Sequence, residues 1–511
     1  MNHYSKDLLA SVVVFLVALP LCLGISIASG VPPAFGLITG IVGGIVVGSL
    51  AGSPLQVSGP AAGLAVLVAE IVRDHGIVAL GPILLLAGLL QLLAGSLKVG
   101  GWFRAMSPAV VHGMLAGIGV LILASQFHVM LDDKPKSSGI ANLASIPGAI
   151  LGGIFPIDGS SHELAALTGL ITISALLLWN KFKPASLQLI PGALVAVIAG
   201  TSAAALFGMP VQRVNVPVNL LEAVHLPDSL SLQALLQPSV LASAFAMAFI
   251  ASAETLLSAS AVDRMQQHVR TDYDKELRAQ GVGNMICGLL GSLPMTGVIV
   301  RSSANVQAGA RTRLATVLHG TWLLAFVLGL PWLLRMIPTA CLAAILVYTG
   351  YKLVNPKDVR HLATYGRFPV VIYAATLIGI VVEDLLTGVL VGIALTTAKL
   401  LYKMTHLELI TERAEHGNRI DLHLVGAATF FKLPKLAAAF ESLPPNSEVH
   451  LHLDRLVYID HSCLDLIFEM RTQMESAGSL LVTEWDGLRH RFELPNQSDR
   501  VRSLRPQTSK S

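Results

Sequence analysis

The chain has 511 residues, of which 53% are hydrophobic and 13% are charged, whereas soluble domains carry about 25% charged residues. This composition indicates a membrane protein and excludes both a single soluble globule and a disordered chain. The net charge of +3 is too small to indicate nucleic-acid binding. Long unbroken apolar runs exclude a β-barrel, whose strands alternate in hydrophobicity.

Apolar runs follow one another from the N-terminus to about residue 404. The first run, Leu8–Ile27, is too long for the core of a signal peptide, so we interpret it as a retained membrane span. A helix needs roughly 20 apolar residues to cross a membrane, and Gly, Pro or charged residues separate the runs. We predict fourteen segments, at 8–28, 36–50, 59–71, 79–97, 107–126, 165–179, 189–207, 240–258, 278–292, 296–309, 314–330, 335–350, 368–382 and 384–404.

The third and tenth segments are short and begin at helix-breaking sequences, Ser58–Pro60 (SGP) and Pro294–Gly297 (PMTG). Such breaks leave free backbone N–H groups at the start of a half-helix. Interrupted segments in corresponding positions of two halves indicate the binding site of a transporter. The spacing of seven segments predicts two repeats of opposite topology. For either break alone, a kink in a packed helix is an equal alternative.

The two half-helix starts together predict a pocket for an anion. If they face each other, the positive ends of both helix dipoles and the free N–H groups converge. Arg301 follows the second break by about one turn, and a guanidinium inside a membrane is costly unless it faces a cavity or a counter-charge. We assign Arg301 to the anion site; a structural ion pair or snorkelling to the interface is the alternative. The small residues that let a ligand approach the backbone are Gly59, Ala61, Ala62, Gly63 and Gly297.

Glu254 is the second ionisable residue inside a predicted span, within the apolar run Ala242–Leu257. A carboxyl group there can carry a proton, whereas a smaller Asp with hydroxyl and carbonyl neighbours would suit sodium better. Ser258 lies four residues further on and shares the same helix face. We predict proton coupling at Glu254 and Ser258; a permanently protonated packing residue is the alternative.

The charges of the connecting loops predict the orientation of the chain. With the N-terminus inside, alternate loops carry basic clusters such as those within 264–278 and 352–367, and the opposite loops carry few basic residues. The asymmetry is roughly three to one, and Lys and Arg accumulate on the cytoplasmic side. We predict a multi-pass protein of the inner (plasma) membrane with both termini in the cytoplasm.

Beyond about Leu407 the chain becomes more charged, and strand-like alternation appears. The predicted strands are 419–424 and 449–453, and the predicted helices are 432–441 and 464–477. Strands that alternate with helices indicate a small α/β domain. We predict a transmembrane domain over 1–406, a cytoplasmic α/β domain over 407–494 and a disordered tail over 495–511.

No residue pattern indicates an enzyme, a metal site or a cofactor. The chain has no GxxxxGK[ST] loop and no arrangement of a nucleophile with a base. The four cysteines form no CxxC pair. His450, His452, His461 and Cys463 have no recognised ligand spacing, so we expect strand and surface positions for the histidines.

Four stretches carry a resemblance to a known family. They are Leu19–Leu37, which contains GVPPAFGL, then Ser58–Pro60, Arg301–Ala315 and Val457–Leu464. In their order and spacing the chain resembles the sulfate permease (SulP) family of anion transporters over nearly its whole length. Val457–Leu464 looks like the signature loop of the STAS domain that ends those proteins.

The resemblance implies a fourteen-span, seven-plus-seven inverted repeat with core and gate subdomains, which works as a homodimer by an elevator-like movement. Glu254 matches an acidic position of the family that is Asp, with a hydroxyl one turn later, in sodium-dependent bicarbonate transporters, so Glu favours protons. Ala61 departs from the family, in which this position is often Thr or a larger residue, so Ala61 offers no hydroxyl. His461 stands where related anti-sigma-antagonist STAS domains have a phosphorylatable Ser, which argues against phosphorylation there. The resemblance places the anion near Ala61, Ala62, Gly297, Val300 and Arg301, facing Leu21 and Ile25.

We therefore predict a secondary active transporter in the lipid bilayer that moves a small oxyanion such as sulfate, bicarbonate or a dicarboxylate inward with protons. Two alternatives remain open, a sodium-coupled bicarbonate transporter and an uncoupled anion channel or exchanger. A third is an anion-sensing scaffold whose STAS domain recruits partners. Which anion is carried does not follow from the residues.

Overall fold

The computed structural model of the chain describes residues 3–103, 107–136, 138–154, 162–184, 187, 189–217, 220–227, 233–266, 269–413 and 418–483. The chain forms two compact units, Met1–Ile393 and Ala394–Ser511. This division falls inside the last long helix of the predicted transmembrane domain, and the first unit ends thirteen residues before the predicted boundary at 406. The predicted tail, 495–511, and the end of the predicted α/β domain, 484–494, lie outside the described residues.

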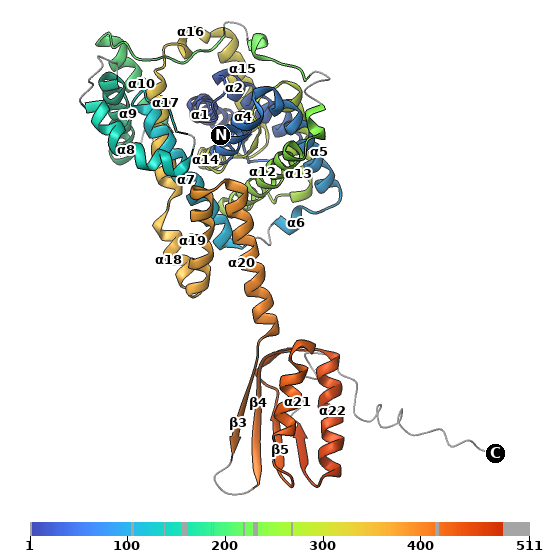
Figure 1. Cartoon of the computed structure of the whole chain (residues 1–511). Coiled ribbons are helices and arrows are strands. Elements are labelled where there is room, and N and C mark those ends of the chain that lie inside the picture. The colour runs from blue at the N-terminus through green and yellow to red at the C-terminus, as the bar shows by residue number, and fades with distance from the viewer. Residues whose placement is uncertain are drawn as a thin grey trace, which may run out of the picture. The chain divides into compact units, whose positions relative to one another are not determined.

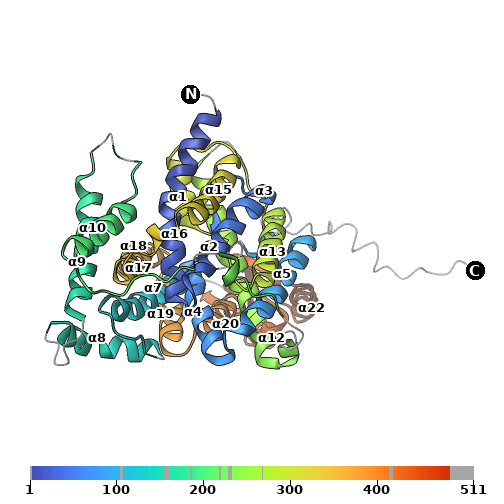
Figure 2. The ribbon, with the colours of Figure 1, turned by 90° about the horizontal axis from the view of Figure 1, so that it is seen from above.

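The first unit consists almost entirely of helices (Figure 1). In Figures 1 and 2, α8, α9 and α10 lie on one side, α5 and α13 lie on the other, and α1 runs between them. The long helices are α1 (His3–Ala28), α2 (Pro33–Val42), α4 (Ala62–His75), α5 (Leu80–Ser96), α7 (Pro108–Met130), α8 (Gly139–Ile154), α9 (His162–Phe182), α10 (Gly192–Leu206), α12 (Pro238–Met265), α13 (Tyr273–Leu289), α14 (Ile299–Gln307), α15 (Leu314–Gly329), α17 (Thr339–Leu353), α19 (Arg367–Val382) and α20 (Leu385–Thr405).

Short elements connect these helices. They are the π-helical turn η1 (Gly43–Val47), α3 (Gly48–Leu50), the 3₁₀ turns η2 (Ile77–Ala79), η4 (Leu220–Ala223) and η5 (Ala234–Leu236), α6 (Gly100–Phe103), α16 (Pro331–Leu334) and α18 (Pro356–Ala363).

Each of the fourteen predicted segments overlaps a helix of the structure. Within the described residues, seven helical stretches are long and apolar enough to cross a membrane, and four shorter apolar helices accompany them. α8 was not expected; its 16 residues are apolar but contain Pro147, and their small residues gave no clear span in the sequence. The fold is therefore predominantly helical, and the number of crossings stays a prediction.

Pairs of glycines allow helices of the first unit to touch. α5 packs against α13 where a Cβ at Gly88 would lie 2.6 Å from the Gly281 carbonyl oxygen. α7 packs against α17 in the same way, because a Cβ at Gly119 would lie 2.7 Å from the Gly350 carbonyl oxygen. Small residues at such contacts are the usual means of close helix association in membranes.

The second unit contains a five-stranded sheet with two helices on it (Figure 1). β3 pairs antiparallel with β4, β4 pairs parallel with β5 and β6, and β5 pairs parallel with β7. Leu422, Leu451 and Ile467 contribute to its apolar core. The elements are β3 (Leu407–Arg413), β4 (Arg419–Ala428), the 3₁₀ turn η6 (Phe430–Lys432), α21 (Leu433–Glu441), β5 (Glu448–His452), β6 (Leu456–Ile459), α22 (His461–Ser476) and β7 (Leu480–Thr483).

Candidate anion site

The two predicted helix breaks pair with each other. β1 (Ser58–Gly59) and β2 (Thr296–Gly297) form a two-stranded antiparallel sheet in which Ser58 lies opposite Gly297. α4 and α14 begin directly after these strands. We call the paired strands and the two helix starts the crossing. Because β1 and β2 share hydrogen bonds, the N-termini of both half-helices lie at one place in the first unit.

Thr255 of α12 binds residues at the crossing through two hydrogen bonds. The Gly297 N–H donates to Thr255 Oγ1 at 3.1 Å, and Gln56 Nε2 donates to the Thr255 carbonyl at 2.9 Å. A Cβ at Gly297 would collide with the Gln56 side-chain amide. A side chain at this position would therefore displace Gln56 from its hydrogen bond to Thr255.

A second set of polar side chains comes from α13. Asn284 Oδ1 accepts from the Met295 N–H at 2.8 Å, and Gln280 Nε2 donates to Ser58 Oγ at 2.6 Å. Gln280 Nε2 also donates to Glu276 Oε1 at 2.9 Å. We did not predict these polar contacts from the sequence. The signal was present, because Glu276, Gln280 and Asn284 recur every four residues and so line one helix face. All three are buried.

Arg301 is fully buried beside the crossing. Its Nη2 donates to the Pro60 carbonyl at 3.2 Å, while Nε and Nη1 have no hydrogen-bond partner among the described residues. A Cβ at Gly59 would collide with Nη1. No carboxylate within the described ranges forms an ion pair with Arg301. A buried charge without a counter-charge is costly, so this guanidinium is suited to bind an anion.

Glu254 lies against the start of α4. A Cβ at Gly63 would lie 2.7 Å from Glu254 Oε2, and that oxygen is buried without a hydrogen-bond partner among the described residues. The side chain as a whole is partly accessible. Ser258, one turn further along α12, is 7% exposed. Glu254 thus lies at the same crossing as Arg301, and Ser258 lies one turn further along α12.

The remaining predicted site residues come from α1, α4 and α14. α1 packs against both half-helices, and its Leu21 and Ile25 are buried. Ala61 is buried and Ala62 is partly accessible. Val300, in the first turn of α14, is 47% exposed, whereas Arg301 next to it is fully buried.

A cavity of about 700 Å³ lies beside α4. Val66, Glu70 and Arg73 of α4 line it. Together with Ala62 they are at least partly accessible and recur along one face of the helix. The accessible face of α4 therefore leads from the crossing to this cavity. The cavity is also lined by Leu121 and Ser125 of α7, by Pro135–Lys136 and Ser138–Gly139, by Asn142 of α8, and by Ile380, Glu383 and Asp384 at the α19–α20 turn.

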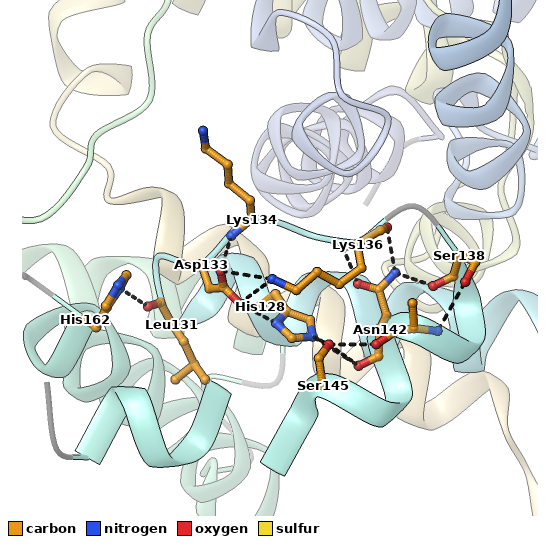
Figure 3. Close-up of polar contacts among 10 residues, drawn as sticks. His128, Leu131, Asp133, Lys134, Lys136, Ser138, Asn142, Ser145 and His162 are labelled. Carbon is orange, nitrogen blue, oxygen red and sulfur yellow. Dashed lines mark hydrogen bonds and ion pairs between the residues drawn. The ribbon is translucent and has the colours of Figure 1, made fainter. Parts of the chain in front are cut away.

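A polar cluster holds one wall of this cavity (Figure 3). His128, fully buried at the end of α7, contacts Asp133 Oδ2 through Nδ1 at 2.8 Å and the Asn142 carbonyl through Nε2 at 3.1 Å. Asn142 also binds the Lys136 backbone, accepting its N–H at 2.8 Å and donating to its carbonyl at 3.0 Å. Ser145 Oγ lies 3.0 Å from His128 Nε2.

The structure also places the histidines that the sequence singled out. His450 contacts Glu448 and His452 contacts Asp421, both at 2.9 Å on the sheet of the second unit. Cys463 is buried in the core of that unit. Across the described parts of the chain, no group of three or more His, Cys, Asp or Glu residues is placed to hold a metal ion.

Sequence comparison decides the family. The family model described as the sulfate permease family matches residues 4–376. The chain belongs to the sulfate permease family. As a member, it is an integral membrane protein of a family of anion transporters and not an enzyme.

Several relatives of this permease-family chain have names or structures. YvdB of Bacillus subtilis is 30% identical over 422 residues, which cover 81% of this chain and 77% of YvdB. The bicarbonate transporter BicA of Synechocystis is 27% identical over 426 residues, which cover 80% of this chain and 71% of BicA.

Two solved structures share its fold. The transmembrane domain of a cyanobacterial bicarbonate transporter BicA superposes with a TM-score of 0.63 at 25% identity, covering 76% of this chain and 98% of that one. The murine anion transporter Slc26a9 in its inward-facing state superposes with a TM-score of 0.76 at 14% identity, covering 94% and 85%. The second likeness concerns the fold alone.

Proposed function

We propose that this permease-family chain is a secondary active transporter of small oxyanions of the sulfate and bicarbonate class, coupled to protons. The observation that carries the proposal is the fully buried Arg301, whose Nε and Nη1 have no partner among the described residues, beside two converging half-helix starts. A small oxyanion supplies the counter-charge and the acceptor oxygens that this arrangement needs.

The anion in this proposal lies between the first turns of α4 and α14. Their leading N–H groups have no partner within the helix and carry the positive end of each dipole. Arg301 adds the charge, and Leu21, Ile25 and Val300 supply apolar contacts. Gly59, Ala61, Ala62, Gly63 and Gly297 have no side chain or a single methyl group, which lets a small ligand approach the backbone. Relatives named as bicarbonate transporters support a substrate of this size.

Glu254 carries the coupling proton in this proposal. Its Oε2 lies buried against α4 without a partner among the described residues, and Ser258 lies one turn away. A protonated carboxyl avoids the cost of a buried negative charge next to an incoming anion. Protonation would therefore favour anion binding, which is the linkage that symport requires.

The wider architecture is part of the same proposal. We propose fourteen spans in two inverted repeats of seven, with both termini cytoplasmic in the plasma membrane, a STAS domain over 407–494, a homodimer, and elevator-like movement. Two glycine contacts support the repeat: Gly88 with Gly281, between the fourth and ninth predicted spans, and Gly320 with Gly44, between the eleventh and second. In an inverted repeat of seven spans, the fourth span corresponds to the eleventh and the ninth to the second, so the two contacts are equivalent.

Uptake into proteoliposomes tests the proposal. The full-length protein is supplied with radiolabelled sulfate, bicarbonate or succinate under an inward proton gradient, an inward sodium gradient, or neither. We expect accumulation with the proton gradient alone, and loss of that accumulation in Glu254→Gln with anion exchange retained. Exposed Glu163 of α9 offers the matched control Glu163→Gln, which should behave as wild type.

Other outcomes would select other functions. Accumulation that requires sodium would make the chain a sodium-coupled transporter, and downhill flux without any coupling would make it a channel or exchanger. Anion binding without transport would indicate a sensor. Each of these results contradicts proton symport.

A further inference from the structure

Two cavities of the first unit meet at Glu70. The cavity of about 700 Å³ and a smaller one of about 290 Å³ both have Glu70 and Arg73 of α4 in their walls, together with Glu383 and Asp384 of the α19–α20 turn. The smaller cavity also reaches Ala246 of α12. Of the acidic residues of α4, Glu70 lines both cavities and lies nearer to the crossing along the helix than Asp74 does.

α4 connects Glu70 to Glu254 along one face. Gly63, Val66, Leu67 and Glu70 are spaced three, four and seven residues apart, so they lie on the same side of the helix. Gly63 contacts the Glu254 carboxyl, while Val66 lines the larger cavity and Leu67 the smaller one. Seven residues of helix rise about 10 Å, which two or three hydrogen-bonded waters span.

α12 also connects the smaller cavity with Glu254. Ala246 lines the smaller cavity, and Glu254 follows it by eight residues, which keeps the two on one helix face. α4 and α12 pack against each other. The smaller cavity therefore lies between two helices that both continue to the Glu254 carboxyl.

We infer that Glu70 is a proton-transfer residue between these cavities and Glu254. The Glu70 carboxylate accepts a proton from a hydronium ion in the cavity, which becomes water. Glu70 then passes the proton through water to the Glu254 carboxylate and is left ionised for the next cycle. No other bond forms or breaks. The inference rests on the proposed proton coupling at Glu254, and adds a residue that neither the sequence patterns nor the anion site requires.

Charged groups around Glu70 suit this role. On its own helix it is followed by Arg73, Asp74 and His75, and Arg73 Nε binds Asp74 Oδ1 at 2.8 Å. The walls of both cavities also contain Glu383 and Asp384, and the wall of the larger one contains Lys136. Carboxylates at a cavity mouth raise the local concentration of protons. The same carboxylates would repel the anion, so the cavity charge fits a proton path better than a second anion site.

The test compares Glu70→Gln and Glu70→Asp with Glu163→Gln in proteoliposomes that contain the full-length protein. Proton-driven sulfate uptake is measured together with proton entry, read by a pH-sensitive dye trapped in the lumen, and with sulfate exchange at equal pH. We expect Glu70→Gln to slow proton-driven uptake by about a hundredfold with unchanged exchange and sulfate KM. Glu70→Asp should restore most of the rate, and Glu163→Gln should match wild type.

The outcomes separate this inference from the proposed function. If Glu70→Gln takes up sulfate and protons at the wild-type rate and pH profile while Glu254→Gln does not, the relay is wrong and coupling at Glu254 stands. Equal loss of exchange and of driven uptake in Glu70→Gln would show a structural role and overturn the relay. Wild-type behaviour of Glu254→Gln would overturn the proposed coupling and the relay with it.

Discussion

Two glycines of one short segment contact the two ionisable side chains of the crossing. Gly59 lies against Arg301 and Gly63 lies against Glu254, and in both places a Cβ would enter the space of the charged group. The Arg301 guanidinium therefore packs against the backbone of β1, and the Glu254 carboxyl packs against the backbone at the start of α4. These two contacts would let an anion bound at Arg301, as proposed, influence Glu254 through a few atoms.

At this scale Arg301 is the residue on which anion affinity should depend most. We expect Arg301→Ala to raise the dissociation constant for sulfate about tenfold to a hundredfold, because a charge-assisted hydrogen bond is lost. Sulfate-dependent shifts of the unfolding temperature measure this constant. Arg360→Ala, which changes an exposed arginine of α18, is the control and should bind as wild type. Equal affinities in all three proteins would contradict the assignment.

Gly297→Ala tests the packing of the crossing. The new methyl group would collide with the Gln56 side chain that binds the Thr255 carbonyl. Overpacking of this kind costs about 1–3 kcal/mol, so we expect a lower unfolding temperature and weaker sulfate binding. The control is Gly148→Ala in α8, where a Cβ meets no atom within 4 Å and the helix should become slightly more stable. Indistinguishable variants would contradict the steric argument.

At the scale of elements, the His128 cluster joins the end of α7 to the start of α8. Both ring nitrogens contact acceptors, the Asp133 carboxylate and the Asn142 carbonyl. Asn142 fixes the backbone of Lys136, and both residues line the larger cavity. The cluster therefore fixes the position of Lys136 in the cavity wall.

Asp133 gives this cluster a defined pH dependence. Burial would raise the pKa of Asp133, but hydrogen bonds from His128 and the Lys134 N–H, and the charge of Lys136, hold it below its ordinary value. A lowered carboxyl pKa contributes stability above the ordinary value near 4, and this contribution is lost as the pH falls through the lowered pKa.

We therefore expect Asp133→Asn to lower the free energy of unfolding at pH 7 by about 1–3 kcal/mol. The difference from wild type should shrink as the pH falls below about 4. Unfolding temperatures of both proteins between pH 7 and pH 3 measure it. Asp132→Asn changes the neighbouring carboxyl and is the control. A difference that stays constant with pH would exclude Asp133 as its source.

At the scale of the whole molecule, all predicted site residues belong to the first unit, and the second unit has a core of its own. Units of this kind can fold independently. We expect a chain that ends after Thr405 to bind sulfate with an affinity within about twofold of wild type, because no predicted site residue belongs to the second unit.

Binding to this shortened chain is measured by the same thermal shift, with the shortened Arg301→Ala protein as the control that should bind weakly. Loss of binding in the shortened wild-type sequence would contradict the independence of the two units. Its transport rate, compared in proteoliposomes, then reports any regulation by the second unit.

Local patterns in the sequence determined much of this protein. Apolar runs mark the helices because a membrane-spanning segment must be continuously apolar and satisfy its own backbone. The Gly and Pro residues at 58–60 and 294–297 mark where the half-helices α4 and α14 begin, because these residues interrupt a helix. Alternation marks two strands of the second unit, β4 and β5. The sequence also singled out Arg301 and Glu254, since an ionisable residue inside an apolar run is rare and costly.

Only the tertiary structure decided what these residues meet. The pairing of β1 with β2, the contacts of Gly59 with Arg301 and Gly63 with Glu254, and the meeting of two cavities at Glu70 join residues far apart in the chain. α8 escaped detection because its small residues and Pro147 weaken the local signal. Hydropathy and periodicity report whether a residue is buried, whereas its partner depends on packing between helices that no local pattern encodes.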